Sequence, residues 1–575
     1  MNDLRNAFSN QPLSLTATSA LRQDLRNYAL QNLPQAMVPS RFVVVGQLPK
    51  LPNGKVDRKR LLQEAQTLQD VEGTPQNTHQ PPTTPEEVQV AHIWKDLLGT
   101  QQIGIEESFF SVGGNSLTAV QMAARIREAF GVAISLRELF EAPTIREIAL
   151  RLGTGSQQVL DQARERSVTP EMLLRESTLP DDIQITEGLK PAVQGLPGTV
   201  LLTGGTGYTG AFLLRALLDR SEARVFVLVR ADSDQHAFER VRQNLQSFDL
   251  WRPQDETRVL AVAGDLGRAY FGLGRSTYER LAEEVEMIVH NGALSNYAQT
   301  YTYLKPINVL GTVEVLRLAC RQRIKPVHFV SSLAVFPVRK GQERFPEAPL
   351  SDPFGVIGGY QQTKWVADRL VTEAGKRGLP INVYRPGQIT GAQQGGQAST
   401  DTFLNAMLKG CIQLGKAMHF DVTLEMVPVD VCAAVISHLA LGGQHHGKVF
   451  HLTNPRQVHW HDVVQMIQAC GYPLKHTDYL EWYGSLTSAL QQGEENELAR
   501  YLVLFGDQAP SPDLGESGSA PVYLTGQLQD ALQGSGIHCE PMGVALMQTY
   551  LKYFESTGFL PARTGEDADA ALSLV

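Results

Sequence analysis

The alternation of apolar and polar positions divides the chain into a mixed part and a helical part. From about Pro197 onward, short aliphatic runs alternate with longer stretches of helical composition. Strands that alternate with helices in this way predict a doubly wound parallel sheet. The first strands are expected within 200–203, 224–230, 259–263, 287–293 and 327–332. A smaller second subdomain is expected from about 395 to the C-terminus, and it includes a strand that runs into a helix at 426–435.

Upstream of residue 197, helical periodicity appears in two stretches. Residues 85–98 place apolar side chains among polar ones at helical spacing, and residues 117–130 carry an apolar stripe. The stripe consists of Ala119, Met122, Ile126 and Phe130. We therefore expect a small all-α domain at 84–152.

The other upstream stretches are predicted to connect or precede these domains. Residues 64–83 are rich in Gln, Thr and Pro, which is typical of a linker. Residues 153–195 are polar and weakly patterned, and we expect a second linker there with one short helix at 169–176. Residues 1–63 contain a helical run, a strand-like run and a turn that presents lysines, which predicts a short α+β fragment.

Composition restricts the class of protein. At 575 residues, 42% hydrophobic and 19% charged, the chain is long enough for several globular domains. A net charge of −9 leaves no basic surface for nucleic acid, so no nucleic-acid partner is expected. The five cysteines are scattered, which predicts buried thiols in a reducing compartment. No signal peptide or bilayer-spanning apolar run is evident, so we expect a cytoplasmic protein without a membrane partner.

Histidines near the C-terminal third invite a metal interpretation. His445 and His446 are adjacent, and His459 and His461 flank a tryptophan. No third ligand follows either pair at a suitable spacing. We therefore expect no metal site.

A glycine-rich turn follows the first predicted strand. Glycines spaced three apart, at 204, 207 and 210, follow Val200–Thr203, and a stretch of helical composition begins directly after them. Such a turn brings the backbone close to a ligand and points the first amides of the helix at an anion. A purely structural turn would show the same letters, but the position between strand and helix favours a dinucleotide site. Its expected contacts are Gly204, Thr206, Gly207, Tyr208, Thr209 and Gly210.

The ends of the next strands refine the choice of dinucleotide. The second strand ends in Arg230, and Arg240 follows on the next predicted helix. A guanidinium at this place suits a 2′-phosphate, so NADPH is the expected cofactor, the alternative being a solvated surface arginine. Asp265 and Leu266 after the third strand are expected to meet the adenine. The cofactor backbone is expected to pass the small residues after the fourth strand, Asn291, Gly292 and Ala293.

A hydroxyl and a Tyr–Lys pair follow the fifth strand. Tyr360 and Lys364 are four apart and share a helix face, and Ser332 ends the strand Val327–Ser332. An ammonium near a phenol would lower the phenol pKa from about 10 toward neutral pH. A chance Tyr-x-x-x-Lys pair is usually structural, but Ser332, Tyr360 and Lys364 after a glycine turn form a rarer set. We predict that these three residues are catalytic.

At this point the chain resembles the extended short-chain dehydrogenase/reductases, and more closely the thioester reductase domains that end peptide synthetases and carboxylic acid reductases. The matching phrases lie at 203–210, 290–293, 308–312, 359–365 and 384–391, and the resemblance covers about 195–560. It implies a Rossmann-type domain at 196–575 whose part from about 395 faces the substrate. It also implies that Asn296 and Asn308 order the site and that the segment beginning with Arg385 lines the nicotinamide. That segment contributes Pro386, Gly387 and Ile389. The family often has threonine in the place of Ser332, and serine keeps the hydroxyl.

The helical domain carries a second resemblance. Ser116 follows a glycine pair and precedes an apolar helix, which by itself indicates an N-cap. The phrase Phe109–Leu117 within 84–152 is similar to peptidyl carrier proteins, which are four-helix domains. This resemblance implies that Ser116 carries a 4′-phosphopantetheine arm, attached by a phosphopantetheinyl transferase, and that the arm holds an acyl or peptidyl thioester.

The N-terminal fragment resembles the end of an adenylation domain of nonribosomal peptide synthetases. The matching phrases lie at 33–39 and 48–59, and in that family the lysine matching Lys55 contacts the acyl-adenylate. The large adenylation core does not occur in this chain. The resemblance therefore implies upstream adenylation and condensation modules, or a separate adenylation core, as partners.

Together these features predict NADPH-dependent reductive release of a carrier-bound thioester as an aldehyde, with further reduction to an alcohol left open. A nucleotide-sugar epimerase or dehydratase shares the serine, tyrosine and lysine, but it needs no carrier arm. A second alternative is a carrier and docking scaffold whose related fold releases products by cyclisation without reduction. The presence of both Tyr360 and Lys364 argues against that alternative.

Overall fold

The computed structural model describes most of the chain from residue 80 onward. The described residues are 80–99, 103–107, 109, 112, 114, 116–131, 134, 139, 144–152, 168–297, 299–337, 344–420, 422–443, 446–505 and 521–561. They belong to two compact units, which we describe separately. The adenylation-like fragment with Lys55, and nearly all of the linker at 64–83, lie outside the described residues and stay predictions.

The first unit contains three α-helices among its described residues up to 152, and it also includes residues 490–495 and 499–505. The three helices are α3 (Pro85–Leu98), α4 (Ser116–Phe130) and α6 (Ile145–Leu152). Helix α3 starts in a capping box, in which the Thr84 side chain accepts a hydrogen bond from the Glu87 amide. The predicted stripe of α4 is buried at Ala119, Met122 and Ile126. The α4 helix begins at Ser116, so this serine is its first helical residue.

A seven-stranded parallel sheet forms the centre of the second unit, within the part of the chain that is described. Its strand order is β12-β7-β5-β4-β1-β2-β3, and every neighbouring pair is parallel. The strands are β1 (Thr199–Thr203), β2 (Arg224–Val229), β3 (Val259–Ala263), β4 (Met287–His290), β5 (Val327–Val330), β7 (Ile381–Pro386) and β12 (Lys448–Leu452). The order reverses between β1 and β4, and ligands bind at such a point in open α/β sheets. The predicted doubly wound fold is confirmed.

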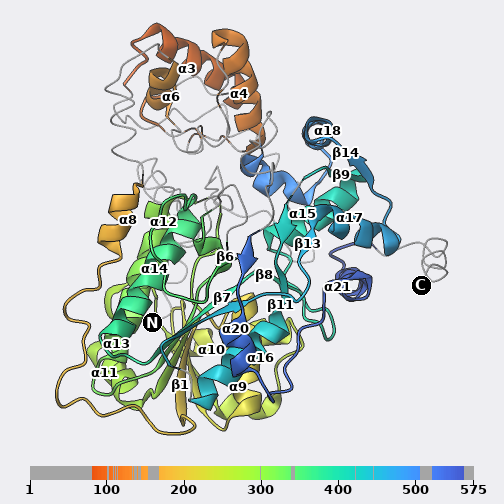
Figure 1. Cartoon of the computed structure of the whole chain (residues 1–575). Coiled ribbons are helices and arrows are strands. Elements are labelled where there is room, and N and C mark those ends of the chain that lie inside the picture. The colour runs from red at the N-terminus through yellow and green to blue at the C-terminus, as the bar shows by residue number, and fades with distance from the viewer. Residues whose placement is uncertain are drawn as a thin grey trace, which may run out of the picture. The chain divides into compact units, whose positions relative to one another are not determined.

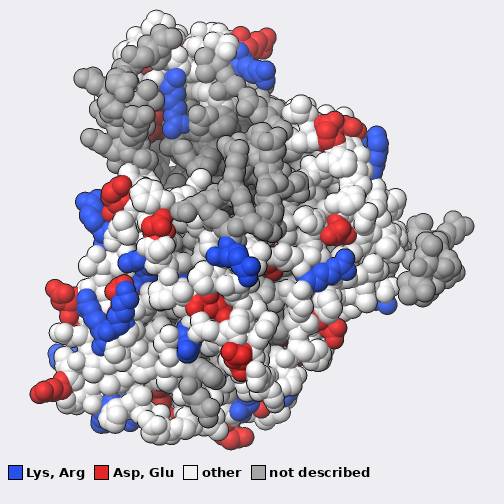
Figure 2. Space-filling model, viewed as in Figure 1, with Lys and Arg blue, Asp and Glu red and all other residues white. Residues whose placement is uncertain are grey.

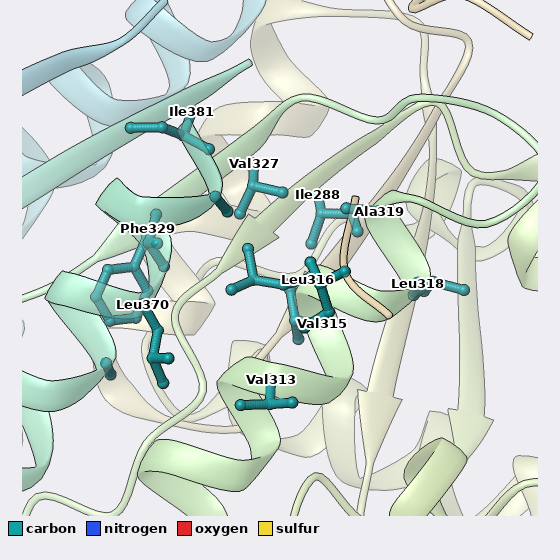
Figure 3. Close-up of a cluster of buried hydrophobic side chains, with 14 of the residues drawn as sticks. Ile288, Val313, Val315, Leu316, Leu318, Ala319, Val327, Phe329, Leu370 and Ile381 are labelled. Atoms are coloured by element: carbon teal, nitrogen blue, oxygen red, sulfur yellow. The ribbon is translucent and has the colours of Figure 1, made fainter. Parts of the chain in front are cut away.

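Helices cover both faces of this sheet (Figure 1). One layer consists of α11 (Arg275–Glu284), α13 (Gly311–Ala319) and α14 (Gly359–Lys376), and the other consists of α9 (Tyr208–Arg220), α10 (Asp234–Gln246) and α16 (Val429–Gly442). In the first layer, Leu316 of α13 and Leu370 of α14 pack with Val327 and Phe329 of β5 (Figure 3). Burial on both faces explains why the strands are almost continuously apolar.

Short elements join the large sheet to a smaller C-terminal region of the same unit. The paired strands are β8 (Gln388–Thr390) with β11 (Met426–Pro428), β9 (Lys416–Met418) with β14 (Lys475–Thr477), β10 (Thr423–Leu424) with β13 (Val458–His459), and β6 (Arg344–Phe345) with β15 (Val522–Tyr523). The α-helices here are α15 (Phe403–Leu414), α17 (Trp460–Ala469), α18 (Tyr479–Gln491) and α21 (Val544–Ser556). Two further helices, α12 (Tyr301–Lys305) and α20 (Gly526–Ala531), pack in the cores of the large sheet.

The region from about 395 differs from the single subdomain that we expected. Strand β12 is the edge strand of the large sheet, and α16 packs on α9 in the core of that sheet. The chain therefore leaves the large sheet after β7 and returns to it at 426–452. The predicted step from strand to helix at 426–435 is confirmed as β11 and α16.

Residues 168–195 pack into the second unit instead of forming a linker. The short helix α8 (Pro170–Glu176) is confirmed, with Thr169 as its N-cap. Leu173, Leu179 and Ile183 are nearly fully buried in the core that contains α13 and α14. The Arg377 guanidinium donates hydrogen bonds to carbonyl oxygens of this segment. Isolated apolar residues and backbone acceptors produce no periodicity, which is why the sequence pattern missed this packing.

The surface and helices of the described residues carry three further observations. Figure 2 shows acidic and basic side chains interspersed on the visible face, without a large area of one sign. No described helix is long and apolar enough to cross a membrane. Within the same residues, no group of three or more His, Cys, Asp or Glu side chains is arranged to hold a metal ion.

Candidate active site

The glycine turn lies at the reversal point of the sheet, between β1 and α9. Gly204 has a φ of +74°, and a Cβ atom there would lie 2.7 Å from the Cα atom of Gly292. A Cβ atom on Gly210 would lie 1.9 Å from the carbonyl oxygen of Gly204. Helix α9 begins at Tyr208, and its N-cap Gly207 provides no side-chain cap. The first amides of α9 are therefore free of a side-chain acceptor from the N-cap residue, as an anion site requires.

Two asparagines hold this turn in place. The Asn244 side chain, on α10, donates to the carbonyl oxygens of Gly205 and Gly207, each at 3.2 Å. The Asn291 side chain, after β4, lies 3.4 Å from the Gly204 carbonyl oxygen. Asn291 is predicted from the sequence, whereas Asn244 is not, because nothing in the local pattern of α10 indicates which helix face meets the turn.

Both predicted arginines lie at the carboxyl end of β2, next to β1. Arg230 and Arg240 are exposed, and the Arg240 guanidinium donates a hydrogen bond to the Arg230 carbonyl oxygen. The Arg240 side chain is therefore held beside the end of β2, where Arg230 follows the strand. The Tyr208 side chain is already hydrogen-bonded elsewhere in the fold. Its hydroxyl donates to the carbonyl oxygens of Thr390 and Gln397, at 2.8 and 2.9 Å, so only its backbone is available to a ligand at the turn.

The predicted adenine residues lie on the loop after β3. The Asp265 carboxylate accepts a hydrogen bond from the Gly267 amide at 2.9 Å. The Leu266 side chain packs on glycines of two other segments. Cβ atoms on Gly292 and Gly311 would lie 3.0 and 2.6 Å from it. Leu266 therefore fills space that only these small residues leave open, and it joins the β3 loop to the segment 291–293 after β4.

A buried chain of hydrogen bonds runs from the glycine turn toward α13. The Gly292 amide donates to the Thr203 hydroxyl at 2.9 Å, and that hydroxyl contacts Nδ1 of His290 at 2.7 Å. Nε2 of His290 contacts the Thr312 hydroxyl at 3.0 Å, which donates to the Asn308 carbonyl oxygen at 2.8 Å. These directions fit a neutral imidazole protonated on Nε2. Burial lowers the pKa of His290 to about 3, which keeps it neutral.

Asn308 ties this chain of hydrogen bonds to the helix that carries Tyr360. It lies in a π-helical turn, η5 (Pro306–Leu310), a feature that often marks functional sites. Its side chain bonds both backbone groups of Leu294, at 2.7 and 3.1 Å, and donates to the Thr363 hydroxyl of α14 at 3.0 Å. Asn308 therefore orders the loop after β4. Asn296 lies in the same loop, two residues beyond Leu294.

Ser332 and Tyr360 lie together at the carboxyl end of β5. Ser332 is the N-cap of the short helix η6 (Leu333–Val335), and its hydroxyl accepts a hydrogen bond from the Ala334 amide at 3.1 Å. Tyr360 is the second residue of α14 and is buried. The Ser332 side chain lies close enough to the Tyr360 phenol to lower its pKa. Two hydroxyl donors therefore meet at one point beside the sheet edge that carries the glycine turn.

Lys364 lies one turn further along α14 and is almost fully buried. Its ammonium donates to the Val330 carbonyl oxygen at 2.7 Å and lies 4.4 Å from the centre of the Phe329 ring. Burial lowers the pKa of Lys364 to about 7, and the carboxylate of Asp368 acts in the opposite direction. The ammonium is therefore directed at the end of β5, next to Ser332.

The pKa of Tyr360 differs from the sequence-based expectation. Burial is the largest cause and raises this pKa above its ordinary value, and the neighbouring Tyr297 acts in the same direction. The nearby Ser332 side chain lowers this pKa. The expected lowering by Lys364 is not seen, because that ammonium points at the Val330 carbonyl oxygen. The ring of Tyr297, which sequence analysis missed, lies 4.9 Å from the ring of Tyr360.

The segment after β7 reaches the same edge of the sheet. Pro386 is the last residue of β7 and is buried, and the preceding Arg385 side chain is also fully buried. A Cβ atom on Gly387 would lie 2.5 Å from the Glu425 carbonyl oxygen, so only glycine fits there. Ile389 is part of β8. Arg385 therefore cannot line the site with its side chain, whereas Gly387 and Ile389 are partly exposed.

Comparisons with known proteins cover both units. Residues 202–436 match an NAD-binding family model described as male sterility protein, and residues 88–152 match the phosphopantetheine attachment site. The chain is 34% identical to a linear gramicidin synthase polypeptide of Brevibacillus parabrevis, covering 93% of this chain and 10% of that protein. It is 30% identical to the L-2-aminoadipate reductase large subunit of Eremothecium gossypii, covering 95% of this chain and 42% of that protein. The chain thus spans less than half the length of these curated relatives.

Solved structures match over their full length. The terminal R domain from the myxalamid PKS-NRPS biosynthetic pathway is 37% identical, with a TM-score of 0.64, and covers 69% of this chain and 100% of its own. A thiolation-reductase di-domain from an archaeal non-ribosomal peptide synthetase has a TM-score of 0.63 at 20% identity, and the match covers 84% of this chain and 100% of that one. This second match supports the fold alone.

Proposed function

Since the chain belongs to the family of carrier-linked terminal reductases of nonribosomal peptide synthetases, as its sequence motifs predicted, we propose that it releases a carrier-bound acyl or peptidyl thioester by NADPH-dependent reduction. The observation that carries this proposal is that the Ser332 and Tyr360 side chains lie together at the carboxyl end of the sheet, where the glycine turn also lies. A phosphopantetheine attachment site in the same chain supplies the means of delivering a thioester.

The residues of the glycine turn fit a dinucleotide. Close backbone packing at Gly204 and Gly210 leaves no room for side chains between the turn and the helix start, so a pyrophosphate can approach the amides of α9. Arg230 and Arg240 favour a 2′-phosphate on the adenosine ribose, and so NADPH over NADH. When bound, NADPH would supply the hydride for the carbonyl carbon.

The carrier unit would deliver the substrate. Ser116, at the start of α4, would hold the 4′-phosphopantetheine arm through its hydroxyl oxygen, and the arm would supply the thiol of the thioester. A phosphopantetheinyl transferase is therefore a required partner. Upstream adenylation and condensation modules, or a separate adenylation core, would select and load the acyl group.

Ser332 and Tyr360 would act on the thioester oxygen. Both hydroxyls donate hydrogen bonds to the carbonyl oxygen as it gains negative charge, which is stabilisation by preorganised donors in a partly dry site. Tyr360 then gives its proton to that oxygen as the general acid. Lys364 holds its ammonium beside the end of β5, where it would bind the nicotinamide ribose of the cofactor.

The tetrahedral product then breaks down without a further redox step. Protonation of the oxygen yields a hemithioacetal, and its C–S bond breaks as the hydroxyl proton moves to sulfur. The products are a free aldehyde and the arm thiol, so one NADPH is consumed per aldehyde. Reduction of the aldehyde to an alcohol, which would use a second NADPH and the same hydroxyl donors, is not part of this proposal.

The test uses the full chain with its arm attached and acylated at Ser116. We expect NADPH consumption together with one free aldehyde per turnover, detected by hydrazine trapping and mass spectrometry. The matched control is Ser116→Ala, which cannot be loaded and should release nothing. Hydrolysis or cyclisation of several different acyl groups without NADPH consumption would contradict the proposal.

A further inference from the structure

A buried ion pair lies directly behind the candidate catalytic residues. The Arg385 guanidinium donates to both oxygens of the Asp368 carboxylate, at 2.9 and 2.8 Å. Both side chains have no exposed surface. Two parallel bonds of this kind fix the relative position of the two residues as well as their distance.

The same carboxylate bonds the neighbour of Ser332. The Ser331 hydroxyl donates to Asp368 at 2.6 Å, and the Ser331 amide donates to the Tyr384 carbonyl oxygen at 2.6 Å. Ser331 is thereby fixed to both α14 and β7. Because Ser332 follows Ser331 directly, Asp368 also fixes the backbone position from which the Ser332 side chain extends.

Asp368 also lies on the helix face of the other two catalytic candidates. It follows Lys364 by four residues and Tyr360 by eight on α14, which places all three on one side of the helix. Its negative charge favours the protonated form of Lys364 against the effect of burial. Asp368 therefore acts on Lys364 through charge and on Ser332 through Ser331.

Arg385 extends the same network to the segment that contains Gly387. Its guanidinium donates to the Ala348 carbonyl oxygen at 2.9 Å and lies 5.2 Å from the centre of the Phe336 ring. It also approaches Nε2 of His451 at 3.4 Å, and burial lowers the pKa of that histidine to about 3. Arg385 is followed directly by Pro386 and Gly387, so this one ion pair holds the three segments that meet at the candidate site.

A purely stabilising role is the simpler interpretation of this pair. However, the cost of removing two charges from water often cancels their attraction. A well-packed apolar pair commonly gives the fold the same stability as a buried ion pair. The second buried pair of this unit, Arg215 with Asp255 at 2.5 Å, lies on α9 and the helix η3 (Pro253–Thr257), away from Ser332 and Lys364. It provides a control in which burial and charge are similar and the position is different.

We propose that Asp368, held by Arg385, is a positioning residue that places the Ser332 hydroxyl and maintains the ammonium of Lys364 for reduction. The inference rests on the proposed function, because it assigns a role within that reaction. The groups that face Lys364 are Asp368 on its own helix, His290 of β4, and the Phe329 ring and Val330 carbonyl oxygen of β5. Asp368 is the one carboxylate in this set.

The experiment measures turnover and NADPH affinity across pH for the full chain and for Asp368→Asn. Without the carboxylate, Lys364 should lose its proton at lower pH. We expect the alkaline decline of kcat to move to lower pH by about one unit, which is about tenfold lower kcat just above neutral pH. Affinity for NADPH, followed by cofactor fluorescence without turnover, should decline with the same shift. Asp255→Asn should reduce the melting temperature and leave both profiles at their wild-type positions.

Two further variants keep the test decisive if Asp368→Asn folds poorly. Arg385→Lys retains the charge pair and should keep the wild-type pH profile with reduced kcat. Ser331→Ala leaves every charge in place and should lower kcat about tenfold with little change in KM for NADPH. Parallel pH profiles for Asp368→Asn and Asp255→Asn, or wild-type kcat in Ser331→Ala, would overturn the proposal. A wild-type chain that binds NADPH but reduces no thioester would refute the proposed function instead, and the affinity profile would still decide the positioning role.

Discussion

The Ser332 and Tyr360 side chains lie close together although they come from different layers of the fold. Ser332 follows a strand of the central sheet, and Tyr360 begins a helix that covers it. Their hydroxyls meet next to the point where the strand order reverses, which is where a dinucleotide binds in such sheets. The pair therefore places two hydroxyl donors beside the predicted cofactor site. Most of the predictions below test either the donors or the cofactor site.

Tyr360→Phe removes the general acid and keeps the ring. We expect turnover to fall by roughly 10²- to 10⁴-fold, because the phenol beside Ser332 would no longer supply a proton. NADPH affinity should change less than about threefold. Stopped-flow turnover and fluorescence titration of NADPH measure the two quantities. An equal loss of cofactor binding would mean that Tyr360 is structural.

Ser332→Ala and Ser332→Thr form a matched pair. Alanine removes one donor to the developing oxyanion and should lower kcat by roughly 10²- to 10³-fold. Threonine keeps the hydroxyl at the N-cap of η6 and should retain most of the activity. Comparable activity of the two variants would exclude a role for the Ser332 hydroxyl.

Arg230→Ala tests the choice between NADPH and NADH. The arginine lies at the end of β2 and is exposed, so its loss should not disturb the fold. We expect NADPH affinity to fall by at least about tenfold, since a charge-assisted bond to the 2′-phosphate is lost, with NADH affinity unchanged. Arg240→Ala should show the same selectivity to a smaller degree. A uniform effect on both dinucleotides would contradict this role.

Lys325 gives a prediction about stability and pH. The residue is fully buried, with its ammonium donating to the carbonyl oxygens of Arg321 and Arg323, and burial lowers its pKa from 10.5 to about 7. Between these two values the unfolded chain binds a proton that the folded chain does not, so the free energy of unfolding rises with pH. Lys325→Met should weaken this rise. Melting temperatures from neutral pH to about pH 9 would measure it, and identical slopes for the two proteins would refute it.

The elements that could be predicted from sequence are those whose information is local. The glycine turn needs a φ value or close contacts that only glycine allows, so Gly204 and Gly210 can be recognised from the sequence. The apolar runs of the parallel strands are visible for the same reason, because each is buried on both faces. Tyr360 and Lys364 are visible because they lie four apart on one helix.

The remaining features depend on partners that are distant in sequence. Asn244 supports the turn from another helix, and Asp368 meets Arg385 only after α14 packs on β7. Tyr297 has no periodicity that would place it against Tyr360. The pKa of Tyr360 was predicted in the wrong direction because burial, which outweighs the expected charge effect, is a property of the assembled fold.

Transfer of a labelled hydrogen tests the central claim most directly. The full chain, loaded at Ser116 with an acyl-pantetheine, would be mixed with NADPH that carries deuterium at the transferable position of the nicotinamide. Our account predicts a released aldehyde with one deuterium on its carbonyl carbon, and a free thiol on the carrier arm. Release of an unlabelled acid, ester or cyclic product while the NADPH label stays in place would contradict it.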